Sequence, residues 1–261
     1  MRLLRHRGVV LTLCAAVITA LIATVLLAPL PYVVTTPGPT ADILGDYSGH
    51  QVLTITGTPT RTTTGQLRMV TIEATSPGTP VYIGDVTHAW TAPDEAVMPA
   101  ASVYPSGESD QQAQADISRQ MTESQDAATT AALSYLDLSP SQVDVTVDLA
   151  DVGGPSAGLM TALGIIDEID PHGGDLTGGH VIAGTGTISD DGTVGAVGGI
   201  PLKMQAAVRD AATVFLLPAA ECGEAQADLP EGLRLVPVKT LSGAIDALDA
   251  LQGEGGNVPH C

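Results

Sequence analysis

The sequence predicts a mixed α/β protein in which strands and helices are interleaved, preceded by an apolar helix and a β-rich segment. Three observations lead to this fold class. An uncharged apolar run lies near the N-terminus, alternating polar and apolar residues mark strands, and glycine-rich turns separate these strands from segments with helical spacing. With 261 residues, the chain is long enough to bury a substantial core without metals or disulfides.

The N-terminal segment has the composition of a membrane anchor. It begins MRLLRHRG, with three arginines, and residues 9–30 then carry no charge. About 20 apolar residues cross the hydrocarbon core, and flanking arginines favour the cytoplasmic side. We therefore expect residues 1–30 to form a cytoplasmic tip and a transmembrane anchor. A cleaved signal peptide is the alternative. However, the apolar run is longer than the apolar core of a usual signal peptide, and Pro29 and Pro31 lie close to the plausible small-residue cleavage site near Ala28.

Charge and motif content exclude two classes of partner. The formal net charge is −19 with only ten Lys and Arg, which excludes nucleic acid as a partner because such a surface repels phosphates. The sequence contains no G-x-x-x-x-G-K-[ST] motif, so we expect no nucleotide binding and no ATP hydrolysis.

Two of the three cysteines form a candidate disulfide. Cys14 lies in the apolar run, whereas Cys222 and Cys261 lie in the part that we expect outside the cytoplasm, where oxidising conditions favour a bond. Closing that loop would contribute about 4 kcal/mol in the chain-entropy model. Two independent thiols are the alternative.

Residues 31–110 have the composition of β structure. The runs QVLTITG, QLRMVTIEA and TPVYIGDV are rich in strand-forming residues and are separated by turn residues, so we expect each to be a strand. Apolar residues in 111–140 recur at helical spacing and predict one long amphipathic helix. These residues are Ile117, Met121, Ala128, Ala132 and Leu136.

Residues 141–261 alternate between strands and helices. VDVTVDL alternates strictly and predicts a half-buried strand, and a helix is expected from Pro155 to about Ile169, because proline suits the first helical position. Further strands are expected at HVIAGTGTI, TVFLLP and LRLVPV. Further helices are expected from Pro201 to Ala212 and at LSGAIDALDAL.

Ser156 lies between a glycine-rich turn and an apolar helix, in DVGGPSAGLMTALG. It either caps that helix or acts as a nucleophile, and a nucleophile needs a base to take its proton. Residues 154–158 satisfy the G-x-S-x-G pattern of α/β-hydrolases, which would require histidine as the base. The candidates His172, His180 and His260 lie in a loop, at a strand start and in the tail, and no HGGG-type segment precedes the serine.

Lysine is the other candidate base, and the chain contains only Lys203 and Lys239. Lys203 follows a double-glycine turn and lies in the first turn of an expected helix, where the helix dipole disfavours an ammonium ion. Burial would lower its pKa further and leave a neutral amine that can act as a general base. By helix physics alone, a solvated lysine is the commoner outcome.

Three ordered motifs between Asp144 and Leu248 resemble the proteolytic domain of the Lon family of serine peptidases. They are GGPSAGLMTAL, AGTGTISDDGTVGAVGGIPLKMQAAVRDAATVFLLP and AAECGEAQADLP. The resemblance implies the Lon proteolytic-domain fold and a Ser/Lys dyad, in which Ser156 attacks the scissile carbonyl and Lys203 removes and returns the proton. It also implies that Thr185 orients the lysine amine; an ordinary strand threonine is the alternative.

The turn that carries the serine offers backbone donors. N–H groups around Gly154, Pro155 and Ala157 lie at a helix start and are candidates for stabilising the oxyanion. The sequence departs from the family at one place, because many Lon domains carry an acidic residue just before G-P-S-A-G. Here that place is Gly153, with Asp151 two residues earlier.

The anchor and the segments PGPTADIL, GQLRMVTIEA and SQDAATTAAL resemble the membrane-anchored, exported Lon-like peptidases of bacteria. Those proteins usually carry a PDZ domain before the catalytic segment. Here the expected helix ends near Leu138 and runs within a few residues into VDVTVDL, which leaves no room for one.

The resemblance, together with the missing nucleotide-binding motif, implies an ATP-independent serine endopeptidase that cleaves exported or unfolded polypeptides without a metal or cofactor. The apolar run and the resemblance together imply a single-pass protein of the cytoplasmic membrane with an extracytoplasmic catalytic domain at residues 141–261. Lon relatives commonly assemble into rings, and the sequence leaves both a monomer and a homo-oligomer open. Two alternatives stay open. One is a catalytically silent Lon-fold interaction module of the cell envelope, and the other is an esterase of the α/β-hydrolase type.

Overall fold

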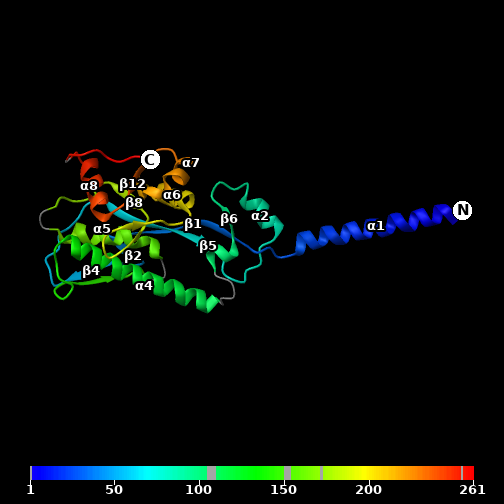
Figure 1. Ribbon diagram of the computed structural model, residues 1–261, viewed down its shortest axis with the longest axis horizontal. Coiled ribbons are helices and arrows are strands. Elements are labelled where there is room, and N and C mark those ends of the chain that lie inside the picture. Colours follow the sequence, from blue (N-terminus) through cyan, green and yellow to red (C-terminus); the bar gives the residue numbers. More distant parts are fainter. Residues whose placement is uncertain (1, 105–109, 150–153, 171–172, 254) are drawn as a thin grey trace. The chain divides into compact units, whose positions relative to one another are not determined.

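The computed structural model describes residues 2–104, 110–149, 154–170, 173–253 and 255–261. It is a mixed α/β structure that divides into two compact units (Figure 1). Unit 1 comprises Met1–Thr36 and Ala74–Ala113, and unit 2 comprises Pro37–Glu73 and Gln114–Cys261.

Unit 1 begins with the apolar helix α1, Arg2–Leu27. Its segment Arg7–Leu27 is long and apolar enough to cross a membrane, and none of its most apolar stretch is buried against the rest of the chain. The helix ends just before Pro29, which cannot continue an α-helix, and the chain enters a strand at Tyr32.

The rest of unit 1 is a small layer next to this helix. The first residues of β1 (Tyr32–Asp42) pair antiparallel with β6 (Ala96–Pro99), with Val33 opposite Met98. Helix α2 (Ile83–Ala89) precedes β6. The short helix α3 follows it at Ala100–Val103.

The expectation of a strand at TPVYIGDV is wrong, because the second half of this segment, from Ile83 to Val86, belongs to α2. The Asp85 carboxylate accepts a hydrogen bond of 2.8 Å from the backbone N–H of Tyr82. A carboxylate placed three residues into a helix can satisfy a backbone donor just before that helix, and this stabilises the helix start. This local capping outweighs the strand propensity of Val81, Tyr82 and Ile83.

The sheet of unit 2 has a parallel core. β11 lies between β8 and β12 and is parallel to both, and β5 pairs with the other edge of β8, also parallel. β1 follows β5 in the order of strands. These strands have the following bounds: β5 Gln66–Ala74, β8 Val181–Gly184, β11 Val214–Pro218 and β12 Arg234–Val238.

Helices cover both faces of this sheet, and consecutive strand residues point to opposite layers. In β11, Leu216 packs in the cluster formed with α4, α5 and α8, whereas Phe215 and Leu217 pack in the cluster formed with α6 and α7. The helices have the following bounds: α4 Asp110–Tyr135, α5 Gly158–Ile169, α6 Ile200–Arg209, α7 Cys222–Ala227 and α8 Leu241–Leu251. This three-layer arrangement buries near-continuous apolar runs such as VFLLP.

Short elements complete unit 2. β4 and β7 form an antiparallel pair that places Leu53 opposite Val147. The other short pairs are β2 with β3 and β9 with β10. Their bounds, with those of the two 3-10 helices, are β2 Asp46–Tyr47, β3 His50–Gln51, β4 Leu53–Thr56, β7 Asp144–Val147, η1 Pro155–Ala157, β9 Thr187–Ile188, β10 Val194–Gly195 and η2 Ala219–Glu221.

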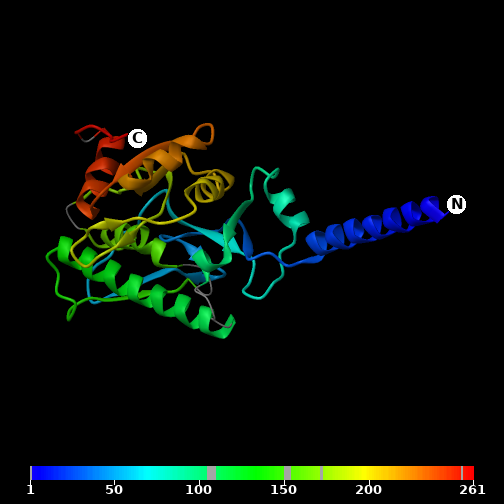
Figure 2. The same cartoon turned by 45° about the vertical axis from the view of Figure 1, so that its right-hand side comes forward.

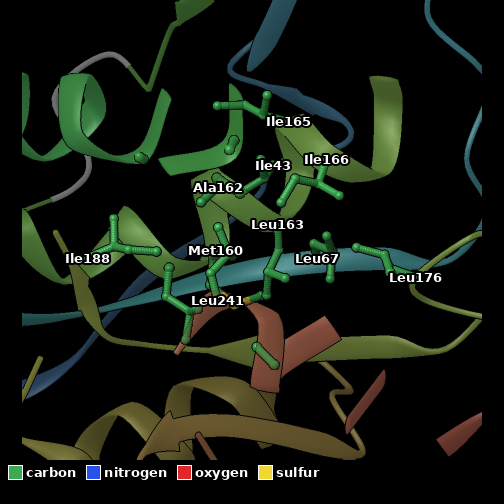
Figure 3. Close-up of a cluster of buried hydrophobic side chains, with 14 of the residues drawn as sticks. Ile43, Leu67, Met160, Ala162, Leu163, Ile165, Ile166, Leu176, Ile188 and Leu241 are labelled. Atoms are coloured by element: carbon green, nitrogen blue, oxygen red, sulfur yellow. The ribbon is translucent and has the colours of Figure 1, made fainter. Parts of the chain in front are cut away.

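Helix α5 is the centre of the larger core. All of its residues are buried, and Met160, Leu163 and Ile166 pack among side chains from β5 and the loops (Figure 3). The helix packs closely against the Ile43 side chain at Gly164, where an added Cβ would lie 2.4 Å from it. This packing fixes where the N-terminal end of α5 lies.

The boundaries of the two units differ from those of the segments expected from the sequence. Residues 37–73 were grouped with 31–110, but they belong to unit 2, because β4 and β5 pair with strands of that unit. Most of the long helix α4 also belongs to unit 2, where Ala128 and Ala132 are fully buried.

Candidate active site

The site begins at the turn before α5, which holds Ser156. Gly154 is extended, and η1 leads directly into α5 at Gly158. The hydroxyl of Ser124, in α4, donates a hydrogen bond of 3.0 Å to the carbonyl of Pro155. A Cβ at Gly158 would lie 2.9 Å from this same hydroxyl and 3.0 Å from the Ile188 side chain, so a larger residue there would force the turn and its neighbours to shift.

Lys203 reaches the site from the opposite face of the sheet, on α6. The helix begins after Gly199, whose φ of +73° is a left-handed conformation that favours glycine. The backbone N–H of Lys203 donates to the Gly199 carbonyl at 3.0 Å, which places the lysine in the first turn. Its side chain is only 3% exposed.

Thr185 lies between the two, directly after the carboxyl end of β8. Its backbone N–H donates to the Leu216 carbonyl of β11 at 3.0 Å, and the residue is fully buried. The Lys203 ammonium or amine donates to the Thr185 hydroxyl at 3.1 Å, and this hydroxyl donates to the Ser156 carbonyl at 3.3 Å. In parallel sheets, sites form at this carboxyl edge.

A second hydrogen bond fixes the serine to the same strand end. The backbone N–H of Gly186 donates to the Ser156 carbonyl at 2.9 Å, and the N–H of Leu159 donates to the Gly186 carbonyl at 3.1 Å. The turn of α5 and the end of β8 are therefore joined through backbone groups. This leaves the Ser156 side chain as the group that can rotate.

The structure joins Ser156, Thr185 and Lys203 in one connected group, but not through the serine hydroxyl. Among the described residues, no hydrogen bond links the Ser156 hydroxyl to the Lys203 nitrogen. The link runs from the amine through the Thr185 hydroxyl to the Ser156 carbonyl. Rotation about the Ser156 side-chain bond changes the position of its hydroxyl without disturbing these contacts, because they involve only its backbone.

Burial has a large effect on the Lys203 amine. Desolvation lowers its pKa from 10.5 to about 8, and the nearby carboxylates of Glu221 and Glu224 oppose this shift by favouring the charged form. A lysine in this range holds a substantial neutral fraction in mildly alkaline solution. Its nitrogen can then accept a proton, as a general base must.

The two glutamates were not assigned a role from the sequence. Glu221 ends η2 and Glu224 lies in α7, so both follow β11 at the sheet edge where Thr185 lies. A disulfide joins Cys222, between them in the chain, to Cys261. No local pattern could have revealed this proximity, since it depends on how the end of β11 meets α6.

The oxyanion expectation needs correction at two of its three residues. Pro155 has no N–H and cannot donate. The Ala157 N–H donates to the Gly154 carbonyl at 3.1 Å within the turn, so it is occupied in this conformation. Ser124, which fastens this turn, was also missed by the sequence reasoning.

Histidine is not placed to serve Ser156 as a base in the described part of the site. His180 precedes β8, whereas Thr185 follows it, so the strand separates the two residues by about 15 Å of extended chain. His260 is exposed and lies next to the disulfide-bonded Cys261. His172, Asp151 and Gly153 lie outside the described residues.

Within the residues that the structure describes, no group of three or more His, Cys, Asp or Glu side chains is arranged to hold a metal ion. In comparisons with known proteins, no protein-family model matches the chain, and no curated protein matches it either.

Proposed function

We propose that the chain is an ATP-independent serine endopeptidase of the Lon-like type, with Ser156 as nucleophile and Lys203 as general base. The observation that carries the proposal is the buried lysine amine, which donates to Thr185 at 3.1 Å, while Thr185 is itself bonded to the backbone of Ser156. A buried cation costs free energy, and no carboxylate forms an ion pair with it among the described residues. An amine whose charged form is disfavoured by burial is suited to accept and return the proton of an alcohol.

The proposed reaction uses the two side chains in sequence. The neutral Lys203 amine takes the proton of the Ser156 hydroxyl as the oxygen attacks the scissile carbonyl, and the resulting ammonium gives that proton to the leaving amine. Water then attacks the acyl-enzyme, again with the lysine as base, and Ser156 is regenerated. Thr185 positions the amine by accepting one of its hydrogen bonds, which leaves the nitrogen lone pair free to turn toward the serine.

The backbone N–H of Ser156 is the donor that we assign to the oxyanion. It lies at the N-terminal end of η1 and α5, where helix N–H groups lack intrahelical acceptors and the dipole favours negative charge. The Ala157 N–H can join it only if its bond to the Gly154 carbonyl opens. This arrangement fits acyl transfer and requires no metal.

We further propose that α1 anchors the protein in the cytoplasmic membrane with the remainder on the extracytoplasmic side. Segment Arg7–Leu27 has the length and hydropathy of a span, and the arginines before it favour the cytoplasm. The Cys222–Cys261 disulfide supports this orientation, because such bonds persist outside the cytoplasm. The substrates would then be exported or unfolded polypeptides.

A catalytically silent binding module is the second candidate, and one observation favours it. The Ser156 hydroxyl is not hydrogen-bonded to Lys203 in this conformation. A silent module would keep this arrangement in the presence of substrate, whereas an enzyme would adopt the rotamer that joins the two groups.

Degradation of a fluorescently labelled unfolded substrate, casein, by the full chain in detergent micelles separates these functions. Ser156→Ala and Lys203→Met should each lower the rate by about 10²-fold or more, because general-base assistance is worth 10²–10⁴-fold. Exposed Ser118→Ala and Lys239→Met serve as matched controls and should keep the wild-type rate. Equal rates for Lys203→Met and Lys239→Met would refute the dyad, and absence of cleavage by the wild-type chain would favour the binding module.

A further inference from the structure

The exposed indole of Trp90 is not explained by the packing of unit 1. It is the chain's only tryptophan and is 80% exposed, although α2 buries its neighbours Val86 and Ala89. The Trp90 backbone is fixed, because its N–H donates to the Val86 carbonyl at 3.0 Å and ends the helix. Tryptophan side chains are large and are usually well buried, so an indole left in water points to a binding surface.

The helix that carries Trp90 lies next to the end of α1. The Leu30 N–H donates to the Val81 carbonyl at 2.7 Å, and α2 begins two residues after Val81. α1 and α2 are in contact, and Figure 2 shows the short helix beside the end of α1 that is nearer to β1. All of these residues belong to unit 1, so their placement is one arrangement within a single compact unit.

The length of α1 fixes the depth of this region in a bilayer. The 21 residues of Arg7–Leu27 span about 31 Å at 1.5 Å per residue, which matches a hydrocarbon core of about 30 Å. With α1 crossing the bilayer as proposed, Leu27 would lie at the outer boundary of the hydrocarbon, and Leu30 with Val81 would lie in the headgroup layer. α2 is about 10 Å long, so Trp90 would lie within about 10 Å of the level of Ile83, where the helix begins.

Two tyrosines accompany the tryptophan at this level. Tyr32 follows Leu30 by two residues and is 39% exposed, and Tyr82 follows Val81 directly and is 37% exposed. Tryptophan and tyrosine concentrate at membrane–water interfaces, because the ring is apolar while the N–H or O–H prefers polar neighbours. An aromatic group at this height therefore matches the chemistry of a phospholipid headgroup layer.

The charge around Trp90 indicates which lipid it meets. Asp85, Asp94 and Glu95 are acidic, the sequence from residue 74 to residue 113 contains no lysine or arginine, and His88 lies 3.7 Å from Glu95. Such a surface has no cluster of lysine or arginine to attract anionic lipids. The binding would depend on aromatic insertion rather than on electrostatic attraction.

We propose that Trp90, together with Tyr32 and Tyr82, inserts into the zwitterionic headgroup layer of the bilayer that α1 crosses, so that unit 1 binds the membrane surface. The inference rests on the proposed anchoring by α1. It assigns to α2 the role of holding an aromatic side chain at a fixed height beside the anchor.

Because Trp90 is the only tryptophan, its fluorescence tests the inference in the intact chain. The full chain is reconstituted in phosphatidylcholine vesicles that contain lipids spin-labelled either near the glycerol backbone or near the end of the acyl chain. We expect blue-shifted emission compared with free N-acetyl-tryptophanamide, and several-fold stronger quenching by the shallow label than by the deep one. Water-like emission, with acrylamide quenching equal to that of the free indole and no quenching by either label, would overturn the proposal.

A second variant separates this inference from the anchoring on which it rests. Trp90→Phe combined with Leu13→Trp moves the tryptophan to the exposed middle of α1, where the deep label should quench more strongly than the shallow one. If the deep label quenches the tryptophan at position 13 more strongly while the emission of Trp90 is water-like, the anchoring stands and the headgroup contact is refuted. The exposed Trp90 side chain would then belong to a surface that binds a protein partner. If neither tryptophan is quenched and the chain does not float with the vesicles, both proposals fail.

Discussion

Replacing Lys203 by methionine should stabilise the protein at neutral pH. The lysine is only 3% exposed, and burial lowers its pKa from 10.5 to about 8. One pKa unit corresponds to about 1.4 kcal/mol, so holding the charged amine in the folded protein costs about 3 kcal/mol. Methionine has a similar length and no charge. The Thr185 hydroxyl keeps its own hydrogen bond to the Ser156 carbonyl, so the substitution leaves no buried polar group there without a hydrogen-bond partner.

The gain should depend on pH in a defined direction. Below pH 8, both the folded and the unfolded chain hold the lysine proton, and the wild-type protein bears the full penalty. Between pH 8 and 10.5 the unfolded chain binds more protons than the folded one, so the wild-type free energy of unfolding rises with pH. The advantage of Lys203→Met is therefore about 3 kcal/mol near neutral pH and declines toward zero as the pH approaches 10.5.

Urea unfolding of the full chain in detergent micelles, followed by circular dichroism across this pH range, measures the effect. The matched control is Lys239→Met at an exposed position, which should change the free energy of unfolding by at most about 0.5 kcal/mol. If Lys203→Met is no more stable than the wild type near neutral pH, or if its advantage is the same at every pH, the amine does not bear a desolvation penalty and the reasoning is refuted.

Three further predictions concern the core, the disulfide and the electrostatics of the site. Gly164→Ala should lower the free energy of unfolding by about 1–3 kcal/mol, because the new Cβ would lie 2.4 Å from the rigid, branched Ile43 side chain. Cys222→Ser with Cys261→Ser should lower it by about 4 kcal/mol in the chain-entropy model, since the bond closes a loop with a sequence separation of 39. Both effects are measured by urea unfolding. Glu221→Gln removes a charge that favours the ammonium form of Lys203 and should lower the pKa of this amine further. The rate of peptide cleavage should therefore begin to rise at a lower pH than in the wild type.

Each of these predictions has a result that would contradict it. An added Cβ at Gly223 meets no atom within 4 Å, so Gly223→Ala is the control for the core substitution, and equal effects of the two alanines would contradict the packing argument. Unchanged stability after reduction of the wild-type disulfide would contradict the second prediction. An unchanged or alkaline-shifted profile for Glu221→Gln would show that its carboxylate does not act on Lys203.

Elements with strong local periodicity could be predicted from the sequence. The strand QLRMVTIEA and the helix LSGAIDALDAL coincide with β5 and α8, because alternation and helical spacing are local properties of the chain. The segment TPVYIGDV could not, since one carboxylate, Asp85, satisfies the donor that starts α2. The mixed α/β class is confirmed, while the specific Lon-type fold stays a prediction.

The candidate site was harder to predict, because it depends on contacts between distant segments. The sequence singled out Ser156 by its glycine-rich turn and Lys203 by the scarcity of lysine, but their proximity depends on how β8 and β11 carry Thr185 between α5 and α6. Glu221 also reaches the lysine through this packing. The catalytic roles of these residues stay predictions.

The central claim is that Lys203 activates Ser156, and labelling by a fluorophosphonate probe tests it most directly. The measurement is the rate of adduct formation across pH, with the modified residue identified by peptide mass spectrometry. We predict a single adduct on Ser156, a labelling rate that rises with an apparent pKa near 8, and loss of labelling in Lys203→Met but not in Lys239→Met. An adduct on another residue, or labelling of Ser156 at the wild-type rate in Lys203→Met, would contradict the account.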